Sequence, residues 1–243
     1  MDEYPKIKRL GERAILLEFE PEISPDTLKK VLGVKKFFQE NTLKEKVEIS
    51  NTYNSLLITY NVSIEDVYGS VLNLKDDLSK ANRSFRIVSR LFHIPVCYDD
   101  VFALDLAEMA GSKNLSKKQI IELHSSKDYL VYFTGFLPGF LYLGGLPKTL
   151  HFSRRKHPRS KIEKGAVGIG EKQTGIYPQE SPGGWNIIGN SPVPLFDPAL
   201  DPPCEIHAGD RIRFYPVSLE EHRRMSSEVK KGLYRIKSEE YNG

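Results

Sequence analysis

The sequence predicts an α+β N-terminal domain followed by an all-β domain, either a closed barrel or a sandwich. Up to about residue 84, apolar residues recur at the periods of strands and amphipathic helices. Residues 134–216, a third of the chain, hold 12 of the 18 Gly and 11 of the 15 Pro, and this density excludes long helices there. We therefore expect two domains, residues 1–84 and 85–243.

The first domain is expected to run strand, strand, helix, strand, strand, helix, strand. Alternation of apolar residues predicts strands at 15–19 and 56–60, and a shorter one at 47–49. Ser24 followed by Pro25 predicts the start of the first helix, since Ser caps helices and Pro suits their first position. Ser63 predicts the start of the second helix, whose apolar residues from Ile64 onward recur at helical spacing. Residues 85–96 are expected to be extended.

The second domain is expected to begin with two short helices, at 105–110 and 116–125. Ser116 and Gln119 predict a capping box at the start of the second of these. Strand candidates follow at 129–133, 167–170, 185–188 and 211–217, separated by Gly and Pro turns. Many short strands with dense turn signals are typical of a barrel or sandwich. The charged tail, residues 219–236, is expected to be helical.

Composition and charge exclude several classes of protein. The chain has 243 residues, 40% of them hydrophobic, and a net charge of +3, which is too mild for a dedicated nucleic-acid binder. The sequence contains no run of about 18 apolar residues, which a membrane-spanning helix would need. We therefore expect a soluble, cytoplasmic protein. Cys97 and Cys204 are far apart, and the six His lack metal-ligand spacing on a helix. We therefore expect neither a disulfide framework nor a metal site.

Two local patterns could carry chemistry or could be purely structural. Gly165-x-x-Gly168-x-Gly170 lacks the Gly-Lys-Ser/Thr of a P-loop, so we expect close backbone approach at a barrel bend. Residues 153–164 hold six Arg and Lys. Such a run is usually a solvated loop, but Arg159 could also hold a carboxylate or phosphate with both arms of its guanidinium.

Residues 173–185 form the most unusual segment. They combine Trp185, the only Trp, with Tyr177, with neutral polar side chains and with three Gly. Polar groups could bind a ligand, Gly would let backbone amides approach it, and the rings would wall it. The same composition also suits a long structured barrel loop, and both interpretations stay open.

Three segments make the chain recognisable as a relative of a known family. They are FTGFLPGFLYLGGLP (residues 133–147), HPRSKIEKGAVGIGEKQTGIYPQESPGGWNIIGNSPVPLFDP (157–198) and AGDRIRFYPV (208–217). These segments resemble the KipI / allophanate-hydrolase-subunit-1 family, and shorter matches upstream extend the resemblance over nearly the whole chain. The resemblance implies a small α+β domain followed by a cyclophilin-like all-β barrel domain, a likeness of fold and not of isomerase activity.

The resemblance also implies a site. Residues matching the family's motifs point to Arg159, Gln173 and Tyr177 as catalytic residues. By the same matches, the substrate-binding residues are Phe140, Thr174, Ser181, Gly183, Gly184 and Trp185. Arg159 is the candidate for binding a substrate carboxylate or a phosphorylated intermediate, and no metal is implied.

What the family does implies an activity that needs partner subunits. Members are identified as a subunit of an ATP-dependent 5-oxoprolinase, which converts 5-oxo-L-proline, ATP and water into L-glutamate, ADP and phosphate. The implied partners are a KipA-like subunit and a LamB/YcsF-like subunit, and ATP is used by the complex. Two alternatives stay open: an inhibitor of histidine kinase autophosphorylation, and the carboxyltransferase half of a urea carboxylase or allophanate hydrolase system.

Overall fold

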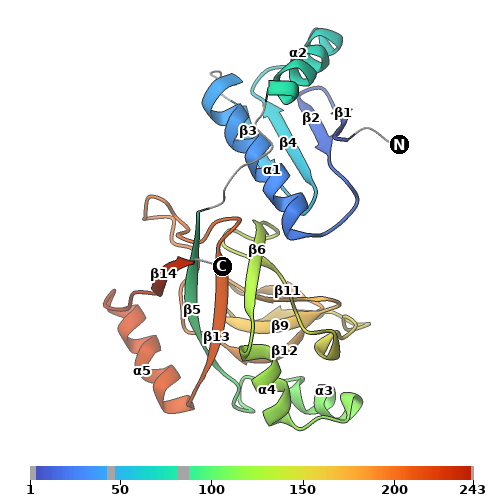
Figure 1. The fold of residues 1–243 in the computed structure, drawn as a ribbon. Coiled ribbons are helices and arrows are strands. Elements are labelled where there is room, and N and C mark those ends of the chain that lie inside the picture. Colours follow the sequence, from blue (N-terminus) through green and yellow to red (C-terminus); the bar gives the residue numbers. More distant parts are fainter. Residues whose placement is uncertain (1–3, 43–46, 81–87, 242–243) are drawn as a thin grey trace. The chain divides into compact units, whose positions relative to one another are not determined.

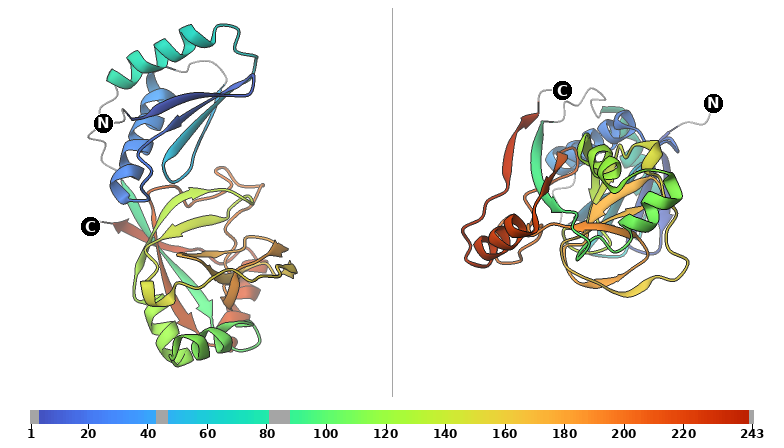
Figure 2. Two further views of the ribbon diagram at one scale, coloured as in Figure 1. Left: turned by 90° about the vertical axis from the view of Figure 1, so that its right-hand side faces the viewer. Right: turned by 90° about the horizontal axis from the view of Figure 1, so that it is seen from below.

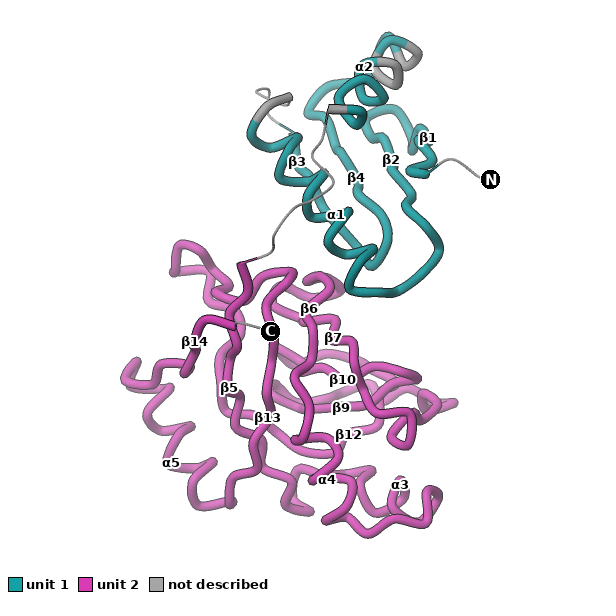
Figure 3. The backbone as a smooth tube through the Cα atoms, viewed as in Figure 1, with its two compact units in different colours: residues 1–87 teal, residues 88–243 magenta. Residues whose placement is uncertain are grey.

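The computed structural model describes residues 4–42, 47–80 and 88–241. The chain divides into two compact units, residues 1–87 and 88–243 (Figure 3). This division lies three residues beyond the boundary expected from the sequence, next to the extended segment that opens the second unit. Each unit has its own hydrophobic core.

The first unit is an antiparallel sheet covered by two helices on one face (Figure 1). Its described elements are β1 (Lys6–Leu10), β2 (Ala14–Glu18), α1 (Pro25–Phe37), a π-helical turn (Phe38–Thr42), β3 (Val47–Asn51), β4 (Ser55–Tyr60) and α2 (Val67–Lys80). The sheet order is β1-β2-β4-β3. Ile15 pairs with Ile58 and Leu17 with Leu56, and these four buried side chains form the face on which the helices pack.

The helix starts of this unit show one success and one error of the sequence analysis. Ser24 caps α1 as predicted, with its Oγ accepting from the amide of Thr27 at 3.2 Å. Ser63 does not cap the second helix. The amide of Ile64 donates to the carbonyl of Glu12 at 2.9 Å, which ties this segment to the turn between β1 and β2. The helix begins at Val67 instead, with Asp66 accepting from the amide of Gly69 at 2.8 Å.

The second unit is a barrel. Its described strands are β5 (Ser89–Cys97), β6 (Asp128–Thr134), β7 (Leu141–Gly144), β8 (Arg159–Ile162), β9 (Ala166–Gly170), β10 (Gln173–Ile176), β11 (Ser181–Gly183), β12 (Asn186–Asn190), β13 (Arg211–Val217) and β14 (Lys237–Tyr241). Among the described residues, seven strands in the order β12-β9-β10-β7-β6-β13-β5 form a sheet that closes when β12 pairs with β5 through Asn190 and Cys97. β8 and β11 form a separate small ribbon.

Helices α3 (Leu106–Lys113) and α4 (Lys117–Ser125) contribute to the barrel core, and a 3-10 turn at Lys148–Leu150 contacts α4. Leu106 and Met109 of α3 and Ile120 of α4 are fully buried with the strand residues. The capping box predicted at the start of α4 is confirmed: Ser116 Oγ accepts from the Gln119 amide, and Gln119 Oε1 accepts from the Ser116 amide at 2.8 Å.

The tail differs from the prediction. Helix α5 (Leu219–Lys230) ends six residues before the predicted limit, and β14 follows it, pairing antiparallel with β5 (Figure 2). Gly232, at a φ of +70°, ends the helix: its amide donates to Val229, and the Leu233 amide donates back to Glu228 at 2.9 Å. β14 was missed because its sequence, KSEEY, is charged and almost wholly exposed. Among the described residues no helix has the length and apolarity needed to cross a membrane.

We predict opposite effects for the same substitution at two glycines. Gly232→Ala should destabilise the second unit by about 1 kcal/mol, because alanine resists a positive φ. Gly111→Ala, at an exposed position of α3 with open space around it, should stabilise the unit by about 0.5–1 kcal/mol. Urea unfolding followed by the fluorescence of Trp185 measures both. Equal effects of the two substitutions would contradict this account of the α5 terminus.

Candidate functional site

Three of the predicted site residues meet in a cluster of aromatic rings. Phe140, Tyr177 and Trp185 are all nearly buried. The ring centroid of Phe140 lies 5.5 Å from those of Tyr177 and Trp185, and the centroids of Tyr177 and Trp185 are 6.4 Å apart, all edge to face. This arrangement is the one that ring quadrupoles favour. The rings therefore pack mainly against one another and form a small core beside the main one.

Glycines make room for this cluster. A Cβ on Gly170 would lie 2.6 Å from the Trp185 ring, and one on Gly183 would overlap the Tyr177 hydroxyl. The predicted close approach is thus seen at Gly170, against a ring, and at Gly165, where a Cβ would lie 2.2 Å from the Ser191 carbonyl oxygen; Gly168 is less tightly packed. For Gly183, the same geometry supplies a packing reason for the absence of a side chain, and its contact with a substrate stays a prediction.

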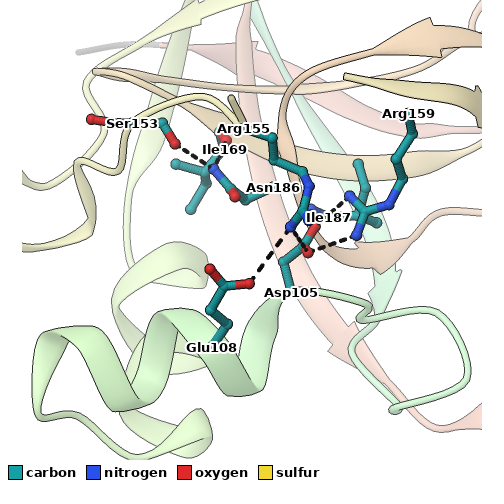
Figure 4. Close-up of polar contacts among 8 residues, drawn as sticks. All are labelled: Asp105, Glu108, Ser153, Arg155, Arg159, Ile169, Asn186 and Ile187. Carbon is teal, nitrogen blue, oxygen red and sulfur yellow. Dashed lines mark hydrogen bonds and ion pairs between the residues drawn. The ribbon is translucent and has the colours of Figure 1, made fainter. Parts of the chain in front are cut away.

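Beside the rings, two arginines of the basic run converge on one buried carboxylate (Figure 4). Asp105 is 2% exposed and precedes α3. Its Oδ1 accepts from Arg155 Nη1 at 2.7 Å and from Arg159 Nη2 at 2.7 Å, and its Oδ2 accepts from Arg159 Nη1 at 2.8 Å. The backbone amide of Ile187, on β12, donates to Oδ2 at 2.6 Å. These four hydrogen bonds use both carboxylate oxygens fully.

The sequence analysis missed Asp105. It placed the residue at the start of a short helix, where an aspartate normally caps the first amides. The Asp105 side chain makes no such hydrogen bond and instead accepts hydrogen bonds from the two arginines. No local signal in the sequence could have shown this, because the arginines lie 50 and 54 positions further along the chain.

The basic run is therefore not a uniformly solvated loop. Arg155 and Arg159 are about one-quarter to one-third exposed and paired with Asp105, and the hydrogen bond to Asp105 raises the pKa of Arg159. Arg154 lies over the Trp185 ring, 5.9 Å from its centroid, while the exposed Lys161 pairs with Glu180 at 2.8 Å. The run thus combines structural ion pairs with cations that face the aromatic cluster.

The loop containing Ser181, Gly183 and Gly184 is attached to this run. β11 pairs with β8, which sets Gly183 opposite Arg159, and the carbonyl of Gly184 accepts from the amide of Arg155 at 2.8 Å. Ser181 is nearly buried on β11, and Gly184 is partly exposed. Burial raises the pKa of Tyr177, while the nearby charges of Arg154 and Arg159 oppose this shift. Tyr177, Arg159 and Gly183 therefore share one neighbourhood.

Thr174 lies elsewhere, inside the barrel, where it is fully buried. Its Oγ1 donates to the carbonyl of Gly168 at 3.1 Å and lies 2.8 Å from His124 Nε2. Because the hydroxyl hydrogen is used, Nε2–H of His124 is the donor, and Nδ1 accepts from the Tyr98 hydroxyl at 2.7 Å. The structure therefore does not bring Thr174 together with the rings and arginines, and its hydroxyl is occupied inside the barrel.

Gln173 is the remaining predicted site residue to be located in the structure. Gln173 is half-buried at the start of β10 and pairs with Gly170 across the β9–β10 hairpin, so it stays next to the glycine that faces Trp185. Within the part of the chain that the structure describes, no group of three or more His, Cys, Asp or Glu is placed to hold a metal ion. A cleft of about 380 Å³ in the second unit is lined by parts of residues 194–206 and 229–236 and contains none of the predicted site residues.

Comparisons with known proteins agree with this architecture. The B subunit of 5-oxoprolinase from Escherichia coli O157:H7 is 37% identical over 212 residues, covering 85% of this chain and 94% of that protein. Its counterpart of the same name from Bacillus subtilis (strain 168) is 32% identical over 233 residues, covering 92% and 97%.

Solved structures show the same fold within longer chains. The structure of TTHA0988 matches with a TM-score of 0.74 and 31% identity, over 85% of this chain and 40% of that one. Urea carboxylase of Kluyveromyces lactis matches with a TM-score of 0.79 and 21% identity, over 97% of this chain and 24% of that one. This second likeness shows the fold alone.

The fold and the adjacent clusters of rings and arginines thus define a two-unit protein with a closed barrel as its second unit. The family described as carboxyltransferase domain, subdomain C and D, matches residues 5–206. The chain belongs to this family, as the resemblance of its Gly- and Pro-rich segments predicted.

We predict that His124 makes the barrel sensitive to acid. Burial lowers the pKa of His124 from 6.5 to about 3, so the folded protein keeps it neutral while the unfolded chain protonates it. The free energy of unfolding should therefore fall by about 1 kcal/mol per pH unit from pH 6.5 down to about 3.

The comparison protein is His124→Gln, measured by urea unfolding at each pH. It should be less stable at neutral pH but should lose less stability than the wild type on acidification. His222, whose pKa burial also lowers, is present in both proteins and cancels in the difference. Parallel pH profiles of the two proteins would disprove the assignment.

We also predict that Gly170→Ala displaces the Trp185 ring. The added methyl group would lie 2.6 Å from the ring, and overpacking of this kind typically costs about 1–3 kcal/mol. The emission of Trp185 should shift to longer wavelength as the ring becomes more exposed. Gly111→Ala should leave the emission unchanged, and an unchanged spectrum of Gly170→Ala would refute the packing role of this glycine.

Proposed function

We propose that this chain is a subunit of an ATP-dependent 5-oxoprolinase, an ATP-hydrolysing cyclic amidase. The observation that carries the proposal is its 37% identity to a 5-oxoprolinase subunit over 94% of that protein's length. The second relative extends the match to 92% of this chain. Near-complete coverage in both directions favours a shared role over a shared fold.

The reaction converts 5-oxo-L-proline, ATP and water into L-glutamate, ADP and phosphate. Phosphorylation of the lactam oxygen by ATP makes the ring carbon electrophilic. Attack by one water then leads to cleavage of the C–N bond and leaves an acyl phosphate, which a second water hydrolyses to the carboxylate of glutamate and phosphate. A protein can assist such a reaction by positioning the reactants and stabilising the developing charge. In this proposal the chain contributes one wall of a composite site and is inactive alone.

Within that wall, Arg159 and Arg154 supply positive charge beside Tyr177 and Trp185. Arg159 lies on β8, whereas Arg154, Tyr177 and Trp185 lie in the segments that flank β8 and β11. A cyclophilin-like topology of the barrel is part of this proposal. ATP is the cosubstrate of the complex, and the proposed partners are a KipA-like subunit and a LamB/YcsF-like subunit. In this proposal the partner subunits supply the other walls of the composite site.

A second candidate function is the carboxyltransferase half of a urea carboxylase system. The match to the family described as carboxyltransferase domain, subdomain C and D, favours it. Against it, a urea amidolyase relative from Saccharomyces cerevisiae is only 22% identical, and the match covers 14% of that protein. We therefore place it behind the 5-oxoprolinase proposal.

Reconstitution tests the proposal. The chain purified with its two proposed partner subunits should release glutamate from 5-oxo-L-proline only when ATP is present, and the chain alone should release none. Glutamate is measured directly by chromatography. A folded three-subunit complex that releases no glutamate would refute the proposed function.

Within that complex, Gln173→Ala should lower turnover at least tenfold, since the half-exposed Gln173 lies opposite Gly170, which faces Trp185, and its amide can donate to developing negative charge. Gln179→Ala is the matched control, because Gln179 is an exposed residue of the loop that follows β10 and should tolerate the change. Circular dichroism checks that both variants fold. Equal turnover in the two variants would remove Gln173 from the site.

A further inference from the structure

Two arginine–aspartate pairs in the second unit use different edges of the guanidinium. Arg213 binds Asp128 through Nε and Nη2, at 2.6 and 2.7 Å, which occupies the side edge of the group. Arg159 binds Asp105 through Nη1 and Nη2, at 2.8 and 2.7 Å, which occupies its end. The end-on pairing leaves the side edge of Arg159, formed by Nε–H and the second Nη2 hydrogen, unused by Asp105.

Asp105 is fixed from several directions. Besides the two arginines, the Ile187 amide donates to its carboxylate, and its own amide donates to the Ile187 carbonyl at 2.8 Å. Its side chain is 2% exposed, whereas that of Arg159 is 25% exposed. The carboxylate is therefore an internal anchor, and the Arg159 side chain that it holds is still partly exposed.

The cluster has more hydrogen-bond donors than acceptors. Nε of Arg155 is buried and has no acceptor among the described residues. Two guanidiniums face one buried carboxylate, and the other acid in reach, Glu108, contacts Arg155 at 3.5 Å and is largely exposed. An excess of donors around a fixed carboxylate suits the binding of a further anion.

We propose that Asp105 is a positioning residue, which holds Arg159 by its end so that the side edge of the guanidinium binds a carboxylate or phosphoryl group. This inference rests on the proposed function for the identity of the anion, since 5-oxo-L-proline carries a carboxylate and the reaction releases phosphate. A lysine at position 159 could carry the charge but could not be held at two points and still offer two parallel donors.

The test measures anion binding to the full-length chain, independently of turnover. Arginine Nε–H signals are recorded by NMR on ¹⁵N-labelled protein during titration with inorganic phosphate and, separately, with 5-oxo-L-proline. In the wild type, the Arg159 signal should shift and saturate with at least one of these probes. Which probe shifts it distinguishes a phosphoryl group from a substrate carboxylate.

Asp105→Asn should abolish the saturable shift or weaken binding at least tenfold. Asp128→Asn, which breaks the other arginine fork, is the matched control and should bind like the wild type. Because Asp105→Asn leaves two arginines without their anchor and can unfold the barrel, Arg159→Lys is the second variant. Arg159→Lys keeps the positive charge and the buried carboxylate, and it should also bind the anion at least tenfold more weakly than the wild type. Because this variant has no Arg159 signal, its binding is measured by the fluorescence of Trp185.

Three results would overturn the inference: no saturable shift in the wild type, wild-type binding by folded Asp105→Asn, or wild-type binding by Arg159→Lys. Binding that depends on Asp105 in a chain whose reconstituted complex makes no glutamate would leave the inference standing and refute the proposed function. The two proposals are therefore tested separately.

Discussion

The region around the candidate site is organised by the buried carboxylate of Asp105. A buried charge is costly unless it is paired and fully hydrogen-bonded, and Asp105 meets this condition with two guanidiniums and a backbone amide. These partners come from the loop before β8, from β8 itself and from β12. One side chain thus fixes the start of α3, the basic run and the strand that follows Trp185. Loss of the Asp105 carboxylate would leave Arg155 and Arg159 without their buried partner.

The positions of the rings in the aromatic cluster are determined by packing, whereas the position of Asp105 is determined by its ion pairs. Phe140, Tyr177 and Trp185 fit together because glycines on neighbouring strands carry no side chain. The two constraints meet in the β8–β11 ribbon, where Gly183 lies opposite Arg159. The proposed function assigns the substrate carboxylate to this partly exposed arginine, next to the buried rings.

The sequence predicted the fold better than it predicted the site, and the reasons are physical. Most local signals were reliable: β13 has the predicted limits of residues 211–217, and Ser116 and Gln119 form their capping box, although Ser63 does not cap α2. Features that depend on distant partners were missed. β14 is a strand only because β5 offers it an edge, and Asp105 is a site residue only because Arg155 and Arg159 fold back onto it. The glycines and the Trp185 segment were recognised as unusual, but their packing role needed coordinates.

The barrel closes between β12 and β5 through the pairing of Asn190 with Cys97. This short junction is reinforced by the Asn190 side chain, which donates to the Lys164 carbonyl at 2.9 Å and lies 2.9 Å from His222 Nε2 of helix α5. Helix α5 therefore contacts the β12–β5 junction, where the barrel closes, from outside the sheet. The C-terminal segment is therefore joined to the barrel twice, through His222 of α5 at the junction and through the pairing of β14 with β5.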